Sequence, residues 1–238
     1  MTAKQLFEAG KVKEAEKALN AWLRNHPADV TQRTFLFELL CFSGQYDRAE
    51  KQLAVLAQGG GPAELGAVMY YSVLHAERSR NELFQKELFP TAPAAPSPSG
   101  TVNGKSFLSF QDVDSTIGAR LEVYAAGAYL WIPFEHIESI KMDAPQRLRD
   151  TLWAPALVVT GPSFKGTELG EVLIPVIYPF SWKHPDESIW LGHGTAWGED
   201  AEAHQYPSGQ KLFLVDDDEL PLLEVRTIEF ATAHAPAQ

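Results

Sequence analysis

The chain is short of cysteine and has no long hydrophobic run. Its single cysteine, Cys41, excludes an internal disulfide framework, and its place in the apolar stretch FLFELLCF predicts a small buried side chain rather than a nucleophile. No stretch approaches the roughly 18 apolar residues that cross a bilayer. The first residues, MTAKQLFEAGKVKEAEKAL, are amphipathic and charged, without the apolar segment typical of a secretion signal. We therefore expect a cytoplasmic protein that does not bind membranes.

Positive charge is scarce, and its shortage is confined to one part of the chain. The chain carries 20 Lys and Arg against 31 Asp and Glu, a formal net charge of −11. Up to Leu88 the two signs are balanced at 11 each, whereas from Phe89 onward 9 basic residues face 20 acidic ones. Such a balance repels phosphate backbones, so nucleic acid is not the expected partner. The sequence predicts a globular protein built from two different parts.

The first part contains a repeat. Residues 6–19 (LFEAGKVKEAEKAL) align with residues 40–53 (LCFSGQYDRAEKQL) at an offset of 34, which matches Gly10 with Gly44. This period, with Gly between two helices, is typical of tetratricopeptide-type helical hairpins. A longer helix without a Gly turn follows from Ala63. We predict a tetratricopeptide-like helical repeat domain over 1–88 and, because prolines stand at 90, 93, 96 and 98, a linker over 89–105.

Stacked helical hairpins leave a curved inner face that commonly holds a peptide or helix of a partner. In the register of the repeat, six side chains of the second and third units point toward that face. These candidate partner-binding residues are Thr34, Glu38, Cys41, Val68, Ser72 and His75. The alternative is that the same side chains pack on the following helix or on the second domain.

The second part changes to strand-like patterns. The segment ARLEVYAAGAYLWIPF contains two strand-like runs that flank Ala126-Gly127, and a Gly at that position predicts a hairpin turn. Further runs of this kind are ALVVT, GEVLIPVIY, KLFLV and LLEVRTIEF, separated by Gly, Pro, Asp and Ser. Short strands with only brief helical turns between them predict a compact mostly β domain over 106–238, either a barrel or a rolled sheet. The expected fold class is therefore α+β.

Residues 181–197, SWKHPDESIWLGHGTAW, gather histidine, acidic and tryptophan side chains and are a candidate site for chemistry. His184, Asp186 and His193 supply donor types that a metal-dependent hydrolase uses. The segment has no HExxH pattern and no Cys pair, and its His-Pro-Asp sequence equally predicts a turn. The glycines of residues 161–168, GPSFKGTE, lack the lysine and hydroxyl of a phosphate-binding loop. The metal-dependent hydrolase is kept as an alternative hypothesis, and neither a metal nor a cofactor is expected.

Several motifs of the second part resemble a known family. In chain order they are LEVYAAGAYLWIPFEHIESI, PQRLRDTLWAPA, GEVLIPVIYPFS and DESIWLGHGTAW. Following a helical region, they are similar to the ImpE/TagJ (SciE-type) accessory proteins of bacterial type VI secretion systems, and the resemblance covers nearly the whole chain apart from the linker. The last motif of the family usually reads L-G-R-x-T-D-W, whereas this chain has His193 and Ala196 in place of the Arg and the Asp. The contacts of those two family residues are therefore not assigned to this chain.

The resemblance implies a non-enzymatic cytoplasmic adaptor. It implies binding to a helix near the N-terminus of the small sheath subunit, and an association with the sheath-recycling ATPase. Arg149 and Asp150, which precede Trp153 in the second motif, are further candidate partner-binding residues. They either fix their own loop by hydrogen bonds or present a polar contact to the partner. A third hypothesis is a structural scaffold or homodimer in which the acidic domain forms the contact.

Overall fold

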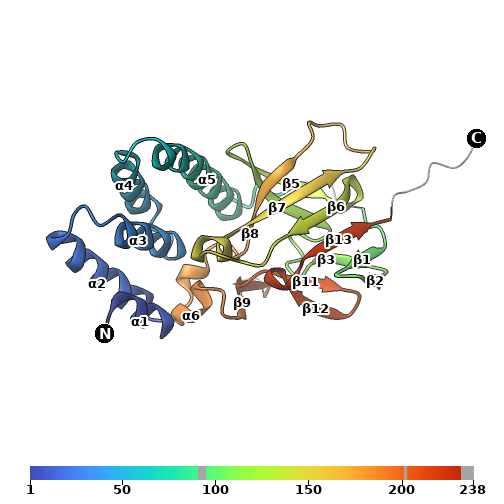
Figure 1. The fold of residues 1–238 in the computed structure, drawn as a ribbon. Coiled ribbons are helices and arrows are strands. Elements are labelled where there is room, and N and C mark those ends of the chain that lie inside the picture. Colours follow the sequence, from blue (N-terminus) through green and yellow to red (C-terminus); the bar gives the residue numbers. More distant parts are fainter. Residues whose placement is uncertain (91–94, 201–202, 232–238) are drawn as a thin grey trace, which may run out of the picture.

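The computed structural model describes residues 1–90, 95–200 and 203–231. Its amino-terminal part is helical and the remainder is built mainly of strands (Figure 1). The helices are α1 (Ala3–Glu8), α2 (Val12–Asn25), α3 (Val30–Phe42), α4 (Tyr46–Ala57), α5 (Pro62–Gln85) and α6 (Glu187–Trp190). The strands are β1 (Gly100–Val102), β2 (Lys105–Phe107), β3 (Phe110–Asp112), β4 (Arg120–Ala125), β5 (Ala128–Pro133), β6 (Ile137–Met142), β7 (Trp153–Thr160), β8 (Gly170–Pro175), β9 (Thr195–Glu199), β10 (Gln205–Gly209), β11 (Leu212–Val215), β12 (Asp218–Pro221) and β13 (Thr227–Phe230). The predicted combination of a helical region with a strand-rich region is confirmed.

The helices begin and end where local chemistry requires it. Asp29 caps α3 by accepting the backbone N–H of Gln32 at 3.0 Å, and Pro62 occupies the first turn of α5, where its missing N–H costs nothing. Gly10 and Gly44 end the helices before α2 and α4 with φ of +72° and +68°, the left-handed conformation that glycine adopts freely. The helical region is thus confirmed, while its relation to tetratricopeptide repeats stays a prediction.

The strand-rich part is organised around an eight-stranded antiparallel sheet. The strand order is β2-β1-β13-β6-β7-β8-β4-β5, and the outer strands β2 and β5 do not pair with each other. The sheet therefore does not close, and the barrel predicted as one alternative is wrong. The strand pattern of the sequence contains no information on closure, because open and closed sheets alternate in the same way. Two smaller sheets have the orders β12-β11-β3 and β10-β9.

The predicted hairpin between β4 and β5 is confirmed. Ala125 pairs with Ala128, and the two residues between them, Ala126 and Gly127, have φ of +49° and +81°. Two positive values are the mark of the primed turns that match the twist of a two-residue hairpin. Near the start of this part, β1 and the first residue of β2 fall within the segment 89–105 that the sequence predicts to be a linker, and residues 91–94 of that segment lie outside the described residues.

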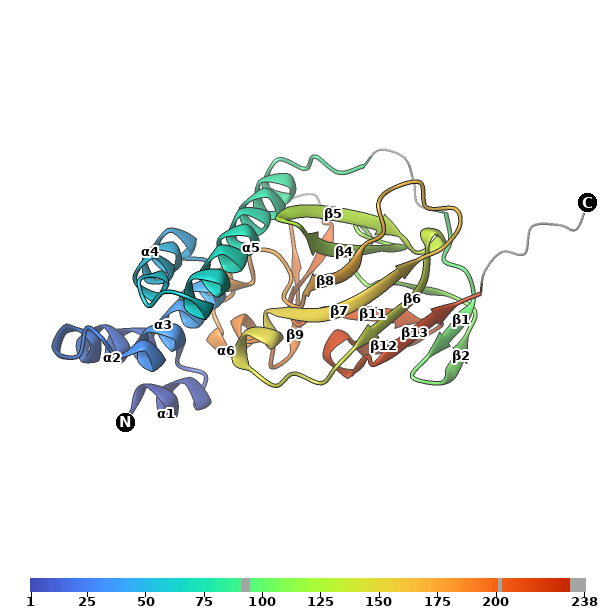
Figure 2. The same ribbon diagram turned by 45° about the horizontal axis from the view of Figure 1, so that its top comes forward.

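One hydrophobic core joins the helices to the sheet. Buried side chains of α1 to α5 pack in the same cluster as Tyr124 of β4, Trp153 of β7 and Trp190 of α6. The indole N–H of Trp153 donates a hydrogen bond of 2.9 Å to a carboxylate oxygen of Glu77 on α5. A second cluster fills the interior of the sheet domain. Figure 2 shows α5 crossing beside the β5 edge of the sheet, and α5 packs directly against β5. The helical stack is therefore in direct contact with the sheet.

Besides Glu77, a connected group of charged side chains is buried at this junction. The guanidinium of Arg80 on α5 donates to both carboxylate oxygens of Glu122 on β4, at 2.8 and 3.0 Å, and to the carbonyl of Ile177 at 2.9 Å. The ammonium of Lys211 contacts both Glu122 and Asp112. We call Arg80, Glu122, Lys211 and Asp112 the junction charge cluster. Its two cations and two carboxylates compensate one another.

Residues 181–191 of the sheet domain contact two turns of the helical stack. A Cβ added to Gly44 would lie 2.4 Å from the ring of Trp182, so this turn and the indole are in direct contact. At the other turn, the backbone N–H of Lys13 donates to Glu187 at 3.0 Å and its ammonium lies 4.7 Å from the centre of the Trp190 ring. Trp182 and Trp190 of the segment SWKHPDESIWLGHGTAW therefore form contacts between the two parts of the molecule.

Candidate partner-binding groove

A groove runs between α5 and the outer face of the sheet. It has a volume of about 1040 Å³, with α5 along one side, β6, β7 and β8 as its floor, and the β4–β5 turn and the loop before β7 at its ends. We call it the α5–sheet groove. Its lining is Met69, Tyr70, Ser72, Val73, Tyr124, Ala126, Gly127, Lys141, Met142, Asp143, Arg147, Arg149, Asp150, Trp153, Pro155, Ala156, Leu157, Glu171, Val172, Leu173, Arg226 and Thr227.

The floor of the groove carries an apolar strip along β7. The side chains of this strand alternate: Ala154, Ala156 and Val158 face the core, while Leu157 and Val159 point outward and are 43% and 36% exposed. Of these two outward side chains, Leu157 lines the groove. The α5 side adds Met69, with an exposed fraction of 47%. Apolar side chains that cluster on a surface and remain in contact with water are a common mark of a contact site for another molecule.

Charges of both signs border this apolar strip, and Lys141 and Glu171 lie directly beside Leu157 on the neighbouring strands. Four cationic and three acidic side chains line the groove, so it is close to neutral in a chain with a net charge of −11. The cationic residues are Lys141, Arg147, Arg149 and Arg226, and the acidic ones are Asp143, Asp150 and Glu171. An apolar strip bordered by both signs is complementary to an amphipathic helix, which presents an apolar stripe flanked by polar residues.

The helical stack and the sheet domain meet at Arg149, at one end of the groove. Its guanidinium lies 5.2 Å from the centre of the Tyr70 ring, and its Nε atom is 3.9 Å from a carboxylate oxygen of Glu38. Burial raises the pKa of Glu38, although Arg149 acts in the opposite direction. Two residues that the sequence assigned to partner binding, 111 positions apart, are thus brought together by the fold.

Comparisons with known proteins agree with this architecture. The family model described as "ImpE protein" matches residues 104–229. The type VI secretion system accessory component TagJ of Pseudomonas aeruginosa is 30% identical over 269 aligned positions, which cover 99% of this chain and 93% of the relative. The chain belongs to the ImpE family. The crystal structure of protein VPA1032 from Vibrio parahaemolyticus has the same fold, with a TM-score of 0.82 at 20% identity and coverage of 97% of this chain and 98% of that one.

As a member of the ImpE family, the chain is related to an accessory component of type VI secretion, and the resemblance found in the sequence motifs is confirmed. An accessory component of a secretion system acts through contacts with other proteins, which is the coarse role that the relative's name supports. Within the described residues, no helix combines the length and the apolar character needed to span a bilayer.

The sequence-predicted residues occupy different environments in this ImpE protein. Ser72, Arg149 and Asp150 line the α5–sheet groove, and Val68 precedes Met69 on the same helix with an exposed fraction of 58%. His75 is exposed on α5 but does not line the groove. The hydroxyl of Thr34 donates to the carbonyl of Val30 at 2.9 Å, and both Glu38 and Cys41 are buried in the helical stack, Cys41 within the shared core.

Asp150 fixes its own loop, one of the two roles left open by the sequence. One carboxylate oxygen accepts the backbone N–H groups of Gln146 and Arg147, at 3.0 and 2.9 Å. These bonds shape the short helical turn Leu148–Thr151 that carries Arg149 to the groove. Asp150 thereby positions its neighbour in addition to lining the groove.

The residues of the hydrolase hypothesis are engaged in local structure. The carboxylate of Asp186 caps α6 by accepting the N–H of Ser188 at 2.9 Å, and the N–H of Asp186 donates to a ring nitrogen of His184 at 3.1 Å. His193 is exposed, and its N–H donates to the carbonyl of Ser188 at 3.2 Å. Among the residues that the structure describes, no group of three His, Cys, Asp or Glu side chains lies close enough together to hold a metal ion.

Sequence reasoning missed the apolar half of the groove. Met69, Leu157 and Leu173 were recognised only as parts of a helix and of strands. The period of two along β7 does place Leu157 and Val159 on one face, but Ala156 and Val158 are equally apolar on the other. Because both faces are hydrophobic, the pattern does not indicate which of them stays open.

Proposed function

We propose that this protein is a non-enzymatic cytoplasmic adaptor of type VI secretion that binds a helix of the small sheath subunit in the α5–sheet groove. Its helical region would be tetratricopeptide-like, and the sheath-recycling ATPase would be a second contact. The observation that carries the proposal is the groove itself: an exposed apolar strip with charges of both signs beside it, shared between the two parts of the molecule. The family relationship to an accessory component supplies the context.

The dimensions of the groove suit one face of a helix. A helix with its side chains is about 10–12 Å across, and three turns extend about 16 Å. A volume of about 1040 Å³ accommodates the side chains of one apolar stripe of such a helix rather than a whole folded domain. Arg149 and Asp150 at one end, and Lys141 and Arg226 elsewhere in the lining, can fix the direction of the helix through polar contacts.

The test compares binding to the small sheath subunit with binding to the same subunit lacking its N-terminal helix. The full-length subunit should be retained in a pull-down and the truncated form should not. Leu157→Glu should weaken the binding of the full-length subunit about tenfold or more, because a carboxylate would be desolvated against the helix. Leu130→Glu is the matched control, because Leu130 is also an exposed strand leucine, at 37%, but lies outside the groove.

The two variants separate the groove from a general effect of added charge. Leu130→Glu should keep the affinity within about twofold of the unchanged chain. Equal binding of the truncated and full-length subunits would exclude recognition of the helix. Equal weakening by both leucine variants would exclude the groove as the binding site.

A further inference from the structure

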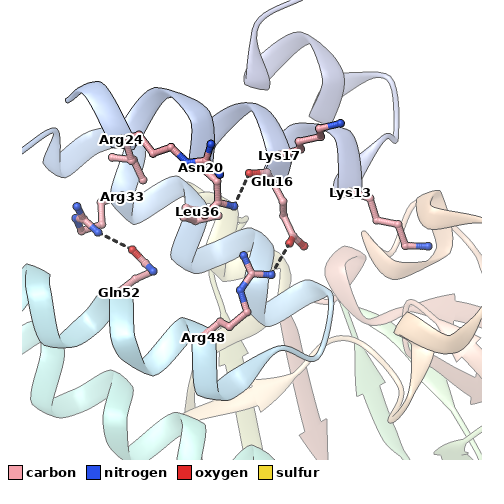
Figure 3. A pocket seen from close by; sticks show the side chains of 10 residues that line it. Lys13, Glu16, Lys17, Asn20, Arg24, Arg33, Leu36, Arg48 and Gln52 are labelled. Atoms are coloured by element: carbon pink, nitrogen blue, oxygen red, sulfur yellow. Dashed lines mark hydrogen bonds and ion pairs between the residues drawn. The ribbon is translucent and has the colours of Figure 1, made fainter. Parts of the chain in front are cut away.

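A second groove lies on the helical stack, away from the sheet. It has a volume of about 610 Å³ and runs between α2 and α4, with α3 beneath it (Figure 3). We call it the α2–α4 groove. Its lining is Lys13, Glu16, Lys17, Asn20, Leu23, Arg24, Arg33, Leu36, Arg48 and Gln52. No residue of this list belongs to the α5–sheet groove.

The α2–α4 groove concentrates positive charge. Five of its ten lining residues are cationic and one is acidic, in a chain whose net charge is −11 and whose first 88 residues are electrically balanced. Lys17 and Arg24 are exposed, and neither makes an ion pair within the described residues. Arg33 donates to the side-chain oxygen of Gln52 at 2.7 Å and to the carbonyl of Pro27 at 2.6 Å, both uncharged groups. The charge of Arg33 is therefore fixed in place without being neutralised.

The acidic residue of the groove is already fully engaged. Glu16 is buried at 6% exposure, and its carboxylate accepts hydrogen bonds from the hydroxyl of Ser43 at 2.7 Å and from the amide of Gln45 at 3.0 and 3.1 Å. Arg48 approaches it at 3.4 Å. Glu16 thus ties α2 to the turn between α3 and α4, and its negative charge is paired with Arg48. Of the cations along α2, Lys13 pairs with Glu187 at 3.4 Å, whereas Lys17 and Arg24 remain available to an external anionic group.

The cations of α2 form a row rather than a single anion site. Lys17, Asn20 and Arg24 are spaced by three and four residues, which places them on one face of the helix. The row extends about 10 Å at 1.5 Å per residue. About three residues of extended peptide, at about 3.3 Å each, cover the same length. Several carboxylates in sequence are therefore a better match to this row than one isolated ion.

We propose that the α2–α4 groove binds an acidic peptide segment of a protein partner, a contact separate from that of the α5–sheet groove. The leucine side chains at its base, Leu23 and Leu36, provide a small apolar floor for one hydrophobic residue of such a segment. A nucleic acid also has the negative charge that the groove attracts. A long polyanion, however, would extend beyond the groove toward the second part of the chain, whose 20 acidic and 9 basic residues repel it. A short acidic segment ends within the groove.

Fluorescence anisotropy with a labelled synthetic peptide, rich in glutamate with one central leucine, tests the proposal on the full chain. The peptide should bind saturably at low ionic strength and more weakly as salt increases. The double variant Lys17→Glu with Arg24→Glu should reduce the affinity about tenfold or more. The matched control is Lys51→Glu with Lys105→Glu, which changes the net charge by the same amount at exposed positions outside the groove.

The control should retain the affinity of the unchanged chain within about twofold. The proposal is overturned if both double variants weaken binding equally, if a lysine-rich peptide of the same length binds as well, or if a single-stranded oligonucleotide binds more tightly than the peptide. The proposal is also overturned if light scattering shows that self-association of the protein accounts for the change in anisotropy. Leu157→Glu should leave peptide binding unchanged, so failure of one groove assignment is distinguishable from failure of the other.

Discussion

At the scale of single residues, Arg80 lies among the buried charges at the junction between α5 and the sheet. Its side chain is 2% exposed and that of its partner Glu122 is fully buried. Removing an ion from water costs several kcal/mol, and this cost is offset only while every partner remains in place. With two cations and two carboxylates, the cluster tolerates the loss of a neutral pair far better than the loss of one member.

Arg80→Met should destabilise the protein by about 3–5 kcal/mol, because Glu122 would keep its buried charge while losing two hydrogen bonds. The free energy of unfolding in urea measures this change. The double variant Arg80→Met with Glu122→Gln should recover part of the loss, because Lys211 and Asp112 then compensate each other. A single variant as stable as the unchanged chain, or a double variant less stable than the single, would contradict the interpretation.

The burial of some residues could be predicted from the sequence, and the burial of others could not. The burial of Cys41 was predicted from its apolar neighbours and is confirmed at 3% exposure. Arg80, in contrast, stands in the charged stretch ERSRNE, which is typical of a solvated helix surface. Its partner Glu122 is 42 positions away on a strand. Local periodicity cannot identify a pair that only the tertiary fold brings together.

At the scale of elements, the turn between α3 and α4 depends on Gly44 for two reasons. Its φ of +68° disfavours any other residue, and a Cβ there would lie 2.4 Å from the ring of Trp182. Gly44→Ala should therefore cost about 1–2 kcal/mol for the left-handed backbone and about 1–3 kcal/mol more for the collision. Urea denaturation gives the total.

Gly60→Ala separates the two contributions. Gly60 has a nearly identical φ of +69°, and no atom of the described residues lies within 4 Å of the Cβ that alanine would add. Its substitution should show the backbone cost alone. If the two alanine variants are equally destabilised, the contact between the α3–α4 turn and Trp182 does not contribute to docking.

Elements were predictable where turn chemistry is local. The β4–β5 hairpin at Ala126-Gly127 and the long helix α5 were both expected from sequence and are confirmed. Closure of the sheet was not predictable, because it depends on whether β2 and β5 meet. The role of residues 181–191 was also hidden, since their aromatic side chains contact turns more than 130 positions earlier in the chain.

At the scale of the whole molecule, the junction charge cluster makes stability depend on pH in two opposite ways. Burial tends to raise the pKa of Glu122, but Arg80 and Lys211 outweigh it and lower that pKa from 4.5 to about 2. Burial raises the pKa of Asp112 from 3.8 to about 6 despite Lys211. A lowered carboxyl pKa contributes stability that is present above pH 4.5 and lost toward pH 2, whereas a raised one contributes stability that is lost as the pH rises from 3.8 to about 6.

Glu122→Gln should therefore flatten the loss of stability between pH 4.5 and about 2, and Asp112→Asn should flatten the decline between pH 3.8 and about 6. The free energy of unfolding, measured in urea at a series of pH values, gives both slopes. Glu219→Gln, at an exposed position of β12, is the control and should leave both slopes unchanged. Slopes unaffected by either buried substitution would refute the assignment.

The arrangement of the two parts was the least predictable feature. Charge balance and the change of pattern near Leu88 correctly indicated two differently built regions. They gave no sign that Tyr124 and Trp153 of the sheet complete the core of the helices. The α5–sheet groove exists only because of that packing, so a site shared by both parts could not be located from either part alone.

The shared core also affects how a partner would associate. The α5 side and the β7 floor of the α5–sheet groove are held by the same buried cluster, in which Val73 and Trp153 both take part. A groove set in this way loses little conformational entropy when it is filled, so most of the ordering cost of binding falls on the incoming segment. A partner segment that is already helical before contact would consequently have the advantage over one that must fold in the groove.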